Sequence, residues 1–402
     1  MIQELMGWDF NTAFMDYGPF WREHRKVFHQ SLHPVAAKQY TPHITKTTHS
    51  LLKRFLNDPD PRKIMPHLRY MAGATILSIA YGIRTQQEND LYIKTAEDAV
   101  HSIAATAVPG AFLVDSIPLL RYVPAWLPGA SFRRKACEWH KLARRMLEMP
   151  YAEVKRTISA GTAIHSIVSE NLERIRARGK DKDPSEDVIK NVAGTLYGAA
   201  SDTTVSAITS CIMGLLENPH ILRKAQAELD SVVKTGHLPD LEDQSSLPYI
   251  TALAKETLRW REMEGCRSDY TENEYNGYHI PAGAIVIPNA WAMLHDESVY
   301  EDPFMFNPDR FIDSATGKVD FSRARDPAHA CWGFGRRICP GHYVAFSEVW
   351  LAIASLICVF DFEKAKVQKK NADGEMEEET AELTHEYVSA LIVLRVHDSC
   401  WF

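Results

Sequence analysis

The chain has 402 residues, 45% of them hydrophobic, and a formal net charge of −7 at pH 7. This composition supports a sizeable core, and the acidic balance argues against nucleic acid as the main partner. The seven cysteines form no C-x-x-C pair and no zinc-type spacing, so reduced thiols are expected rather than a disulfide framework. We recognise no signal peptide and no apolar run of about 18 residues, and Val349 to Phe360 is expected to be a buried helix.

The first predicted helix begins at Pro19, a residue that suits the first turn of a helix. Trp21 and Arg25 are four residues apart and therefore share one face of this helix. The residues alone favour an amphipathic surface helix with a buried Trp. From Thr41 to Gly82 the pattern stays helical, and the nearly continuous apolar residues 71–81 predict a core helix.

A proline-rich passage follows between Pro109 and Pro128, and its four prolines forbid a continuous helix. Its centre carries Trp126 and Leu127 at a tip. Two interpretations of this tip stay open: a contact with lipid, or a loop packed on the core.

A long central helix is expected next, starting at Asp183 as N-cap and running about 33 residues to the breaker Asn218-Pro219. In its middle, residues 198–204 (GAASDTT) weaken helix propensity, and the hydroxyls there can bond back and bend the helix. Such a bend makes a groove for a small molecule. Small residues also permit close helix packing, but Asp202 beside Thr203 favours a proton relay.

Glu256 and Arg259 form an E-x-x-R pair on a later helix, a spacing that recurs elsewhere in the chain, for example at Glu153 and Arg156. An exposed pair of this kind contributes only about 0.2–0.5 kcal/mol, so the spacing alone does not single it out. Residues 276–283 (NGYHIPAG) then predict a turn between short strands.

The stretch 332–341 (WGFGRRICPG) places one cysteine among glycines and two arginines, just ahead of an apolar helical run. The glycines allow a tight loop of positive φ, and the N-terminus of the next helix favours a thiolate. Arg337 is placed to reach an anionic group on whatever the sulfur of Cys339 binds. An isolated cysteine would be a small buried apolar residue, whereas this setting favours a metal-binding thiolate.

These motifs resemble the cytochrome P-450 family, whose haem-binding loop reads F-x-x-G-x-R-x-C-x-G. Every fixed position fits except the first, where Trp332 stands for the usual Phe. Four motifs occur in the family's order: W-x-x-x-R, the oxygen-activation segment with Ala200 in place of a Gly, E-x-x-R with P-x-R-F, and the cysteine loop. The resemblance covers nearly the whole chain and extends to fungal members of the O-methylsterigmatocystin oxidoreductase group.

The resemblance implies a mainly α fold with a small β portion, forming one haem-thiolate domain over residues 1–402. It makes Cys339 the axial ligand of the iron of haem b, in a loop that includes Trp332 and Gly335. Arg267 would stand in for a histidine that binds a haem propionate, because the polar stretch 261–267 replaces the family's proline-rich pocket loop.

The resemblance also assigns roles to residues of the other motifs. The propionate anchors would be, besides Arg267, the residues Trp21, Arg25 and Arg337. Proton delivery would fall to Asp202 and Thr203. A buried structural lock under the haem loop would consist of Glu256, Arg259 and Arg310.

By resemblance the chain is a monooxygenase that inserts one atom of O2 into a small apolar organic substrate, in fungal secondary metabolism (a terpenoid or polyketide) or in xenobiotic oxidation. Electrons would come from NADPH through NADPH–cytochrome P-450 reductase, docked near Arg22, Lys26 and Arg336. Two alternatives remain: a catalytically degenerate haem-binding relic, and a haem-thiolate isomerase or dehydratase.

Full-length members of the family carry a membrane anchor, a proline hinge and the first sheet strands ahead of the W-x-x-x-R helix. The start of this chain lacks these features, so we expect an N-terminally incomplete enzyme that binds haem weakly. Full-length relatives would lie on the cytosolic face of the endoplasmic reticulum membrane, and a peripheral membrane contact is expected for this chain.

Overall fold

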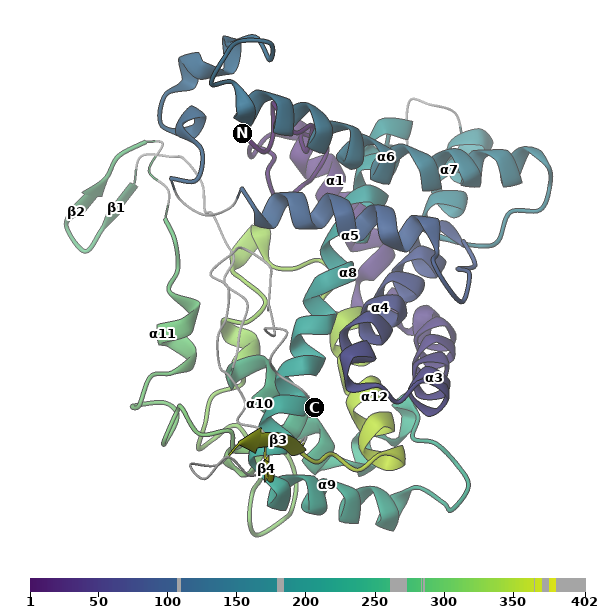
Figure 1. The fold of residues 1–402 in the computed structure, drawn as a ribbon, viewed down its shortest axis with the longest axis vertical. Helices are drawn as coiled ribbons and strands as arrows, with labels where there is room; N and C mark the ends of the chain where they lie inside the picture. The colour runs from purple at the N-terminus through teal and green to yellow at the C-terminus, as the bar shows by residue number, and fades with distance from the viewer. Residues whose placement is uncertain are drawn as a thin grey trace.

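The computed structural model describes residues 1–106, 110–178, 184–260, 273–282, 284 and 286–364, together with the backbone of 366–370 and 376–380. Arg267 lies outside the described residues, as do the rest of the altered loop 261–267 and the strand expected near residues 388–391. The described chain is mainly helical with two short hairpins, which confirms the predicted fold class (Figure 1).

The elements have the following bounds. The helices are α1 (Pro19–Leu32), α2 (Pro34–Ala37), α3 (Thr41–Asn57), α4 (Ile64–Tyr81), α5 (Leu91–Ala104), α6 (Ser131–Ser159), α7 (Ile167–Arg178), α8 (Glu186–Glu217), α9 (Pro219–Val232), α10 (Pro248–Trp260), α11 (Ala290–Leu294) and α12 (His342–Val359). The strands form two antiparallel hairpins, β1 (Asn273–Tyr275) with β2 (Tyr278–Ile280) and β3 (Lys366–Lys370) with β4 (Met376–Thr380).

Helix α8 runs through the middle of the molecule, and α1, α4, α5, α6, α7, α10 and α12 all contact it (Figure 1). It ends at Glu217, as the breaker predicts, but its N-cap is Ser185, whose Oγ accepts from the Val188 amide at 3.3 Å. The predicted N-cap Asp183 is therefore wrong. A serine two residues later captures the free amides of the first turn equally well.

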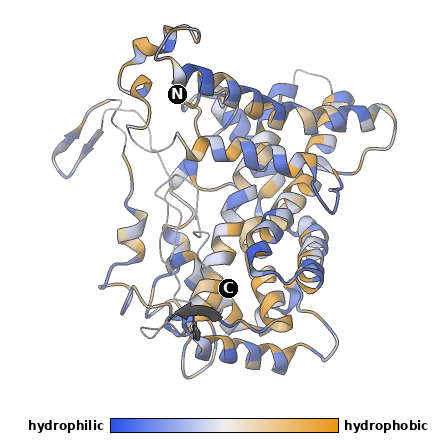
Figure 2. Cartoon of the chain, in the orientation of Figure 1, coloured by the Kyte–Doolittle hydropathy of each residue, from blue (hydrophilic) through white to orange (hydrophobic). Residues whose placement is uncertain are grey.

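The sequence was expected to hold no apolar run long enough to cross a bilayer. That expectation is wrong, because α8 and α12 are both long enough and apolar enough to do so. In the fold, however, 72% of the most apolar window of α8 and 61% of that of α12 are buried within the protein. Helices that are apolar on all sides are either membrane spans or core helices. Neighbouring helices cover both of these (Figure 2).

Small residues of α8 allow the N-terminal segment to pack closely on it. Trp8 is fully buried and stacks on Phe10 with ring centroids 5.3 Å apart. A Cβ added at Gly198 would meet the Trp8 ring at 3.4 Å, and one at Gly194 would lie 2.5 Å from Leu147. Close packing through small residues therefore accounts for these glycines of the central helix.

The predicted turn before residue 283 is present as the hairpin β1–β2. Asn276 and Gly277 connect the strands with φ values of 51° and 81°. Two consecutive residues of positive φ are the requirement of a type I′ turn, which Asn-Gly meets at little steric cost.

Candidate active site

The cysteine loop closes on itself ahead of α12. The Cys339 amide donates to the Trp332 carbonyl at 2.7 Å, and Gly333 and Gly335 take φ values of 76° and 55° within the loop. His342, the first residue of α12, has its Nδ1 2.7 Å from the Cys339 carbonyl oxygen. The thiol is therefore held three residues before a helix N-terminus, a position whose dipole favours a thiolate.

Two arginines and one tryptophan gather beside this thiol. Arg25 and Trp21 lie on one face of α1, with the Arg25 guanidinium carbon 5.7 Å from the Trp21 ring centroid. Arg337 from the cysteine loop lies 5.0 Å from the same ring and donates to the Met15 carbonyl at 3.0 Å. The structure therefore brings Arg337 to Trp21 and Arg25, although Arg337 lies more than 300 residues later in the sequence.

The charges in this cluster suit an anionic group. Burial lowers the pKa of Arg25; the neighbouring Cys339 raises it and Arg337 lowers it further. Among the described residues, no ion pair joins Arg25 to a carboxylate. Two cations side by side, one of them partly buried without an acid among the described residues, fit the carboxylates of a haem whose iron Cys339 would hold.

A basic surface lies next to this cluster. The guanidinium carbons of Arg22 and Arg336 lie 5.6 Å and 5.0 Å from the Tyr17 ring, and Arg336 also donates to the Tyr17 hydroxyl. Hydrogen bonds from both arginines lower the pKa of Tyr17. Lys26, one turn along α1 from Arg22, is exposed as well. A reductase is expected to dock at Arg22, Lys26 and Arg336. Two of these residues, Arg22 and Arg336, contact the same Tyr17 ring.

The predicted proton relay lies in the middle of α8. The Thr203 hydroxyl donates to the Ala199 carbonyl at 3.0 Å, which is the back-bonding that the sequence suggests. The Asp202 carboxylate lies 3.6 Å from Arg69 of α4 and its side chain is 13% exposed. Burial raises the pKa of Asp202, while Arg69 and then His101 of α5 lower it.

Asp202 also has an acidic neighbour that sequence reasoning missed. Burial raises the pKa of Glu97 on α5, Arg69 lowers it, and the charges of Asp98 and Asp202 raise it further. Arg69 therefore lowers the pKa of two carboxyl groups, that of Asp202 on α8 and that of Glu97 on α5. No spacing signal identifies Arg69 or Glu97, because the two residues lie on different helices and meet only when α4 and α5 pack on α8.

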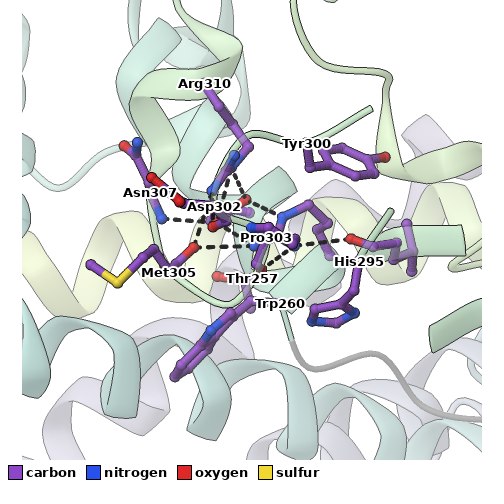
Figure 3. Close-up of polar contacts among 12 residues, drawn as sticks. Thr257, Trp260, His295, Tyr300, Asp302, Pro303, Met305, Asn307 and Arg310 are labelled. Carbon is purple, nitrogen blue, oxygen red and sulfur yellow. Dashed lines mark hydrogen bonds and ion pairs between the residues drawn. The ribbon is translucent and has the colours of Figure 1, made fainter. Parts of the chain in front are cut away.

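Glu256 and Arg259 are fully buried on α10, unlike the exposed copies of the same spacing. Arg259 Nε and Nη2 donate to the two carboxylate oxygens of Glu256 at 2.7 and 2.8 Å. Arg310 Nε lies 3.2 Å from the same carboxylate, and the Asn307 amide donates to it at 2.8 Å. The predicted three-residue contact is therefore present in the fold. Figure 3 labels Arg310 and Asn307 of this network.

Backbone carbonyls take up the remaining donors of the two arginines. Arg259 donates to the carbonyls of Leu294, Pro303 and Met305, and Arg310 to those of Glu301, Asp302 and Met305 (Figure 3). The network thus ties α10 to the loop between α11 and the P-x-R-F segment. A buried charged group is tolerable when its hydrogen bonds are satisfied in this way.

Known proteins that are similar to this chain belong to the family that its motifs resemble. The family model "Cytochrome P450" matches residues 4–386. The chain is 42% identical to cytochrome P450 monooxygenase 98 of Postia placenta, over 90% of this chain and 69% of that protein. It is 38% identical to tryptamine 4-monooxygenase of Psilocybe cyanescens, over 90% of this chain and 71% of that protein. The chain therefore belongs to the cytochrome P450 family and is an oxidoreductase of the monooxygenase class.

Proposed function

We propose that this monooxygenase oxidises a small apolar metabolite, of the terpenoid or polyketide kind, in fungal secondary metabolism, and that it draws electrons from NADPH through a cytochrome P450 reductase. The observation that carries the proposal is the cluster of Cys339, Arg25, Arg337 and Trp21, which combines a thiol with paired cations. The fungal relatives with monooxygenase names support the setting.

Haem b is the cofactor that fits this cluster. When bound, it supplies the iron at which O2 is reduced and the substrate is oxidised. Cys339 would hold the iron, Arg25 and Arg337 would neutralise the propionates, and Trp21 would cover the two guanidinium groups and keep them in place.

Asp202 and Thr203 of α8 would hold and transfer protons for the reaction. Asp202 is largely buried, which favours its neutral form, and has one cationic partner, which favours its charged form. A carboxyl under two opposing influences can take up and release a proton during turnover. The Thr203 hydroxyl, next to it in the sequence, would take part in the same transfer.

The basic surface around Tyr17 is the proposed docking site for the reductase. Arg22, Lys26 and Arg336 present three positive charges next to the loop that carries the cysteine. Complementary charge steers association and weakens with ionic strength. An acidic partner would therefore approach the cofactor from the side of the thiol.

A peripheral membrane contact is proposed for the proline-rich passage, with the cytosolic face of the endoplasmic reticulum as the location. The passage exposes large apolar side chains, and Trp126 has an exposed fraction of 78%. The others are Leu113, Ile117, Leu119 and Tyr122. Exposed apolar patches of this kind mark interaction sites, and Trp and Tyr favour the membrane interface.

The test of the proposed function begins with the absorption spectrum of the reduced, CO-treated protein. A thiolate-type shift of the Soret band is expected in the wild type and in Cys331→Ala, and its loss is expected in Cys339→Ala. Cys331 is the matched control because it lies eight residues earlier in the same region and is a free thiol whose pKa burial raises. Persistence of the shift in Cys339→Ala would refute the assignment.

Turnover then separates the alternatives. A monooxygenase consumes NADPH and O2 in proportion to product. A haem-thiolate isomerase or dehydratase forms product without net consumption of O2, and a degenerate relic shows neither the thiolate signature nor product.

A further inference from the structure

Cys331 and Cys339 are two thiols of the same loop, and only Cys339 is needed to hold the haem iron. Both are half-buried thiols in this structure. Cys331 immediately precedes Trp332, whose carbonyl accepts a hydrogen bond from the Cys339 amide at 2.7 Å. The closed loop therefore places Cys331 next in sequence to the residue that pairs with Cys339. A second thiol at this place matters, because neighbouring cysteines can join as a disulfide.

The charges around the loop also place the two cysteines close together. Burial raises the pKa of Cys331, Lys255 lowers it, and the charges of Asp326 and Cys339 raise it further. Burial lowers the pKa of Arg25, and the charge of Cys339 raises it. Interactions between charges weaken with distance, so Cys339 lies near both Cys331 and a guanidinium group. The cation favours a reactive thiolate on Cys339, whereas Cys331 keeps its proton.

The chain between the two cysteines contains glycines that can adjust to a bond between them. Gly333 and Gly335 have φ values of 76° and 55°. A Cβ added at Gly335 would meet no atom within 4 Å, so this part of the loop lies in open space. Glycine adopts a wider range of backbone angles than any other residue. These positions are therefore available to bring the two sulfur atoms within bonding distance.

We propose that Cys331 is a resolving cysteine that protects the haem ligand, by forming a reversible disulfide with Cys339 when hydrogen peroxide oxidises the chain before haem is bound. The proposal rests on the proposed function, which makes Cys339 the ligand. Hydrogen peroxide is the oxidant that the reaction requires.

The reaction has two steps. The Cys339 thiolate attacks one oxygen of hydrogen peroxide, so that an S–O bond forms, the O–O bond breaks and hydroxide leaves. The Cys331 sulfur then attacks the sulfenic sulfur of Cys339. The S–S bond forms, the S–O bond breaks, and the thiol proton of Cys331 leaves with the hydroxyl group as water. Two thiols are oxidised to one disulfide, and one peroxide is reduced to water and hydroxide.

The competing account makes Cys331 a small apolar residue that only fills space beneath the loop. Without a resolving thiol, the sulfenic acid of Cys339 is oxidised further to a sulfinic acid, which thiols do not reduce. The two accounts therefore differ in whether Cys331 allows Cys339 to recover from oxidation.

The first experiment locates the bond. The full chain is treated with hydrogen peroxide before haem is added, and is digested with trypsin without reduction. Cys331 and Cys339 then lie on the peptides 326–336 and 338–364. We expect one disulfide-linked pair of these peptides, which dithiothreitol separates.

The matched control for this digestion is Cys358→Ser. Cys358 is the other cysteine of the peptide 338–364 and is also half-buried. The linked pair should persist in Cys358→Ser and be absent from Cys331→Ser. Its absence from the wild type, or its loss in Cys358→Ser, overturns the proposal.

The second experiment measures recovery. Wild type, Cys331→Ser and Cys331→Ala receive a pulse of peroxide and then dithiothreitol, and are titrated with haemin. The pulse should remove most haem uptake from all three, and dithiothreitol should restore it only in the wild type. Untreated samples of the variants should take up haem as the wild type does, which shows that they fold. Equal recovery in the wild type and both variants overturns the proposal.

Neither readout depends on turnover by the enzyme. Failure of the proposed function would appear differently, as a thiolate-type Soret shift that survives in Cys339→Ala. The two failures are therefore distinguishable.

Discussion

Glu256 and Asp202 are two acids of the described core that both contact arginine, and their surroundings differ. Glu256 is fully buried and receives Arg259, Arg310 and the Asn307 amide, with contacts of 2.7–3.3 Å. Asp202 keeps 13% of its side chain exposed and has one arginine partner at 3.6 Å. Both oxygens of the first carboxylate accept hydrogen bonds from Arg259, whereas the second carboxylate has a longer ion pair with Arg69.

This difference separates a structural charge from a chemical one. A buried carboxylate whose two oxygens both accept hydrogen bonds from arginine fixes the backbone around it. A carboxylate that burial pushes toward its neutral form, with a single cation opposing, can change its protonation state during a reaction. The predictions below test this difference between Glu256 and Asp202.

The largest change in the free energy of unfolding is expected when Glu256 is removed from its arginines. Glu256→Ala leaves two buried arginines without their anion and should lower the free energy of unfolding by about 3–5 kcal/mol. Glu153→Ala is the matched control, because Glu153 and Arg156 have the same spacing on an exposed surface, and it should cost less than about 0.5 kcal/mol. Denaturant unfolding of both variants measures the difference. Equal losses would show that burial does not distinguish the two pairs.

The next effect concerns chemistry rather than stability. Asp202→Asn should leave folding nearly unchanged but lower product formed per NADPH by about 10²-fold, since the amide cannot deliver protons. Asp187→Asn, an exposed position on the same helix, is the control and should behave as wild type. Product and NADPH are measured together. Undiminished coupling in Asp202→Asn would remove this residue from the relay.

A smaller effect is expected for the arginine that faces Asp202. Arg69 lowers the pKa of Asp202, so Arg69→Met should raise that pKa. The pH profile of product formation should then shift to higher pH, because Asp202 holds its proton over a wider range. Arg69→Lys should restore the wild-type profile by keeping the charge. An unshifted profile in Arg69→Met would mean that the ion pair does not control the relay.

The sequence predicts the contacts of Glu256 better than it predicts the surroundings of Asp202. Glu256 is identified by the order of motifs, and the Trp21–Arg25 spacing by helix geometry, because both depend on local patterns. The altered start of α8 shows the limit of such patterns: Ser185 caps the helix although Asp183 gives an equally good signal. Arg69 and Glu97 carry no local signal, since they approach Asp202 only when distant helices pack together.

The smallest effect tests a buried polar group that must stay neutral. His24 of α1 is fully buried, with Nδ1 2.8 Å from the Phe20 carbonyl oxygen and Nε2 3.3 Å from Asn191 Nδ2 of α8. Nδ1 donates to the carbonyl, so Nε2 accepts from the amide, and the ring is neutral. Burial lowers the pKa of His24 below its ordinary value of 6.5. Protonation would replace the acceptor with a donor facing Asn191.

The sign of the pH dependence follows from this geometry. Below about pH 6.5 the unfolded chain binds a proton at His24 that the folded chain refuses, so the free energy of unfolding falls as the pH drops, by at most about 1.4 kcal/mol per pH unit. His24→Phe should remove this part of the pH dependence, whereas His29→Phe, an exposed position on the same helix, should keep it. Denaturant unfolding at several pH values between about 7 and 5 makes the measurement. If all three proteins lose stability in parallel, His24 is not the group that titrates, and the contact between α1 and α8 does not depend on a neutral imidazole.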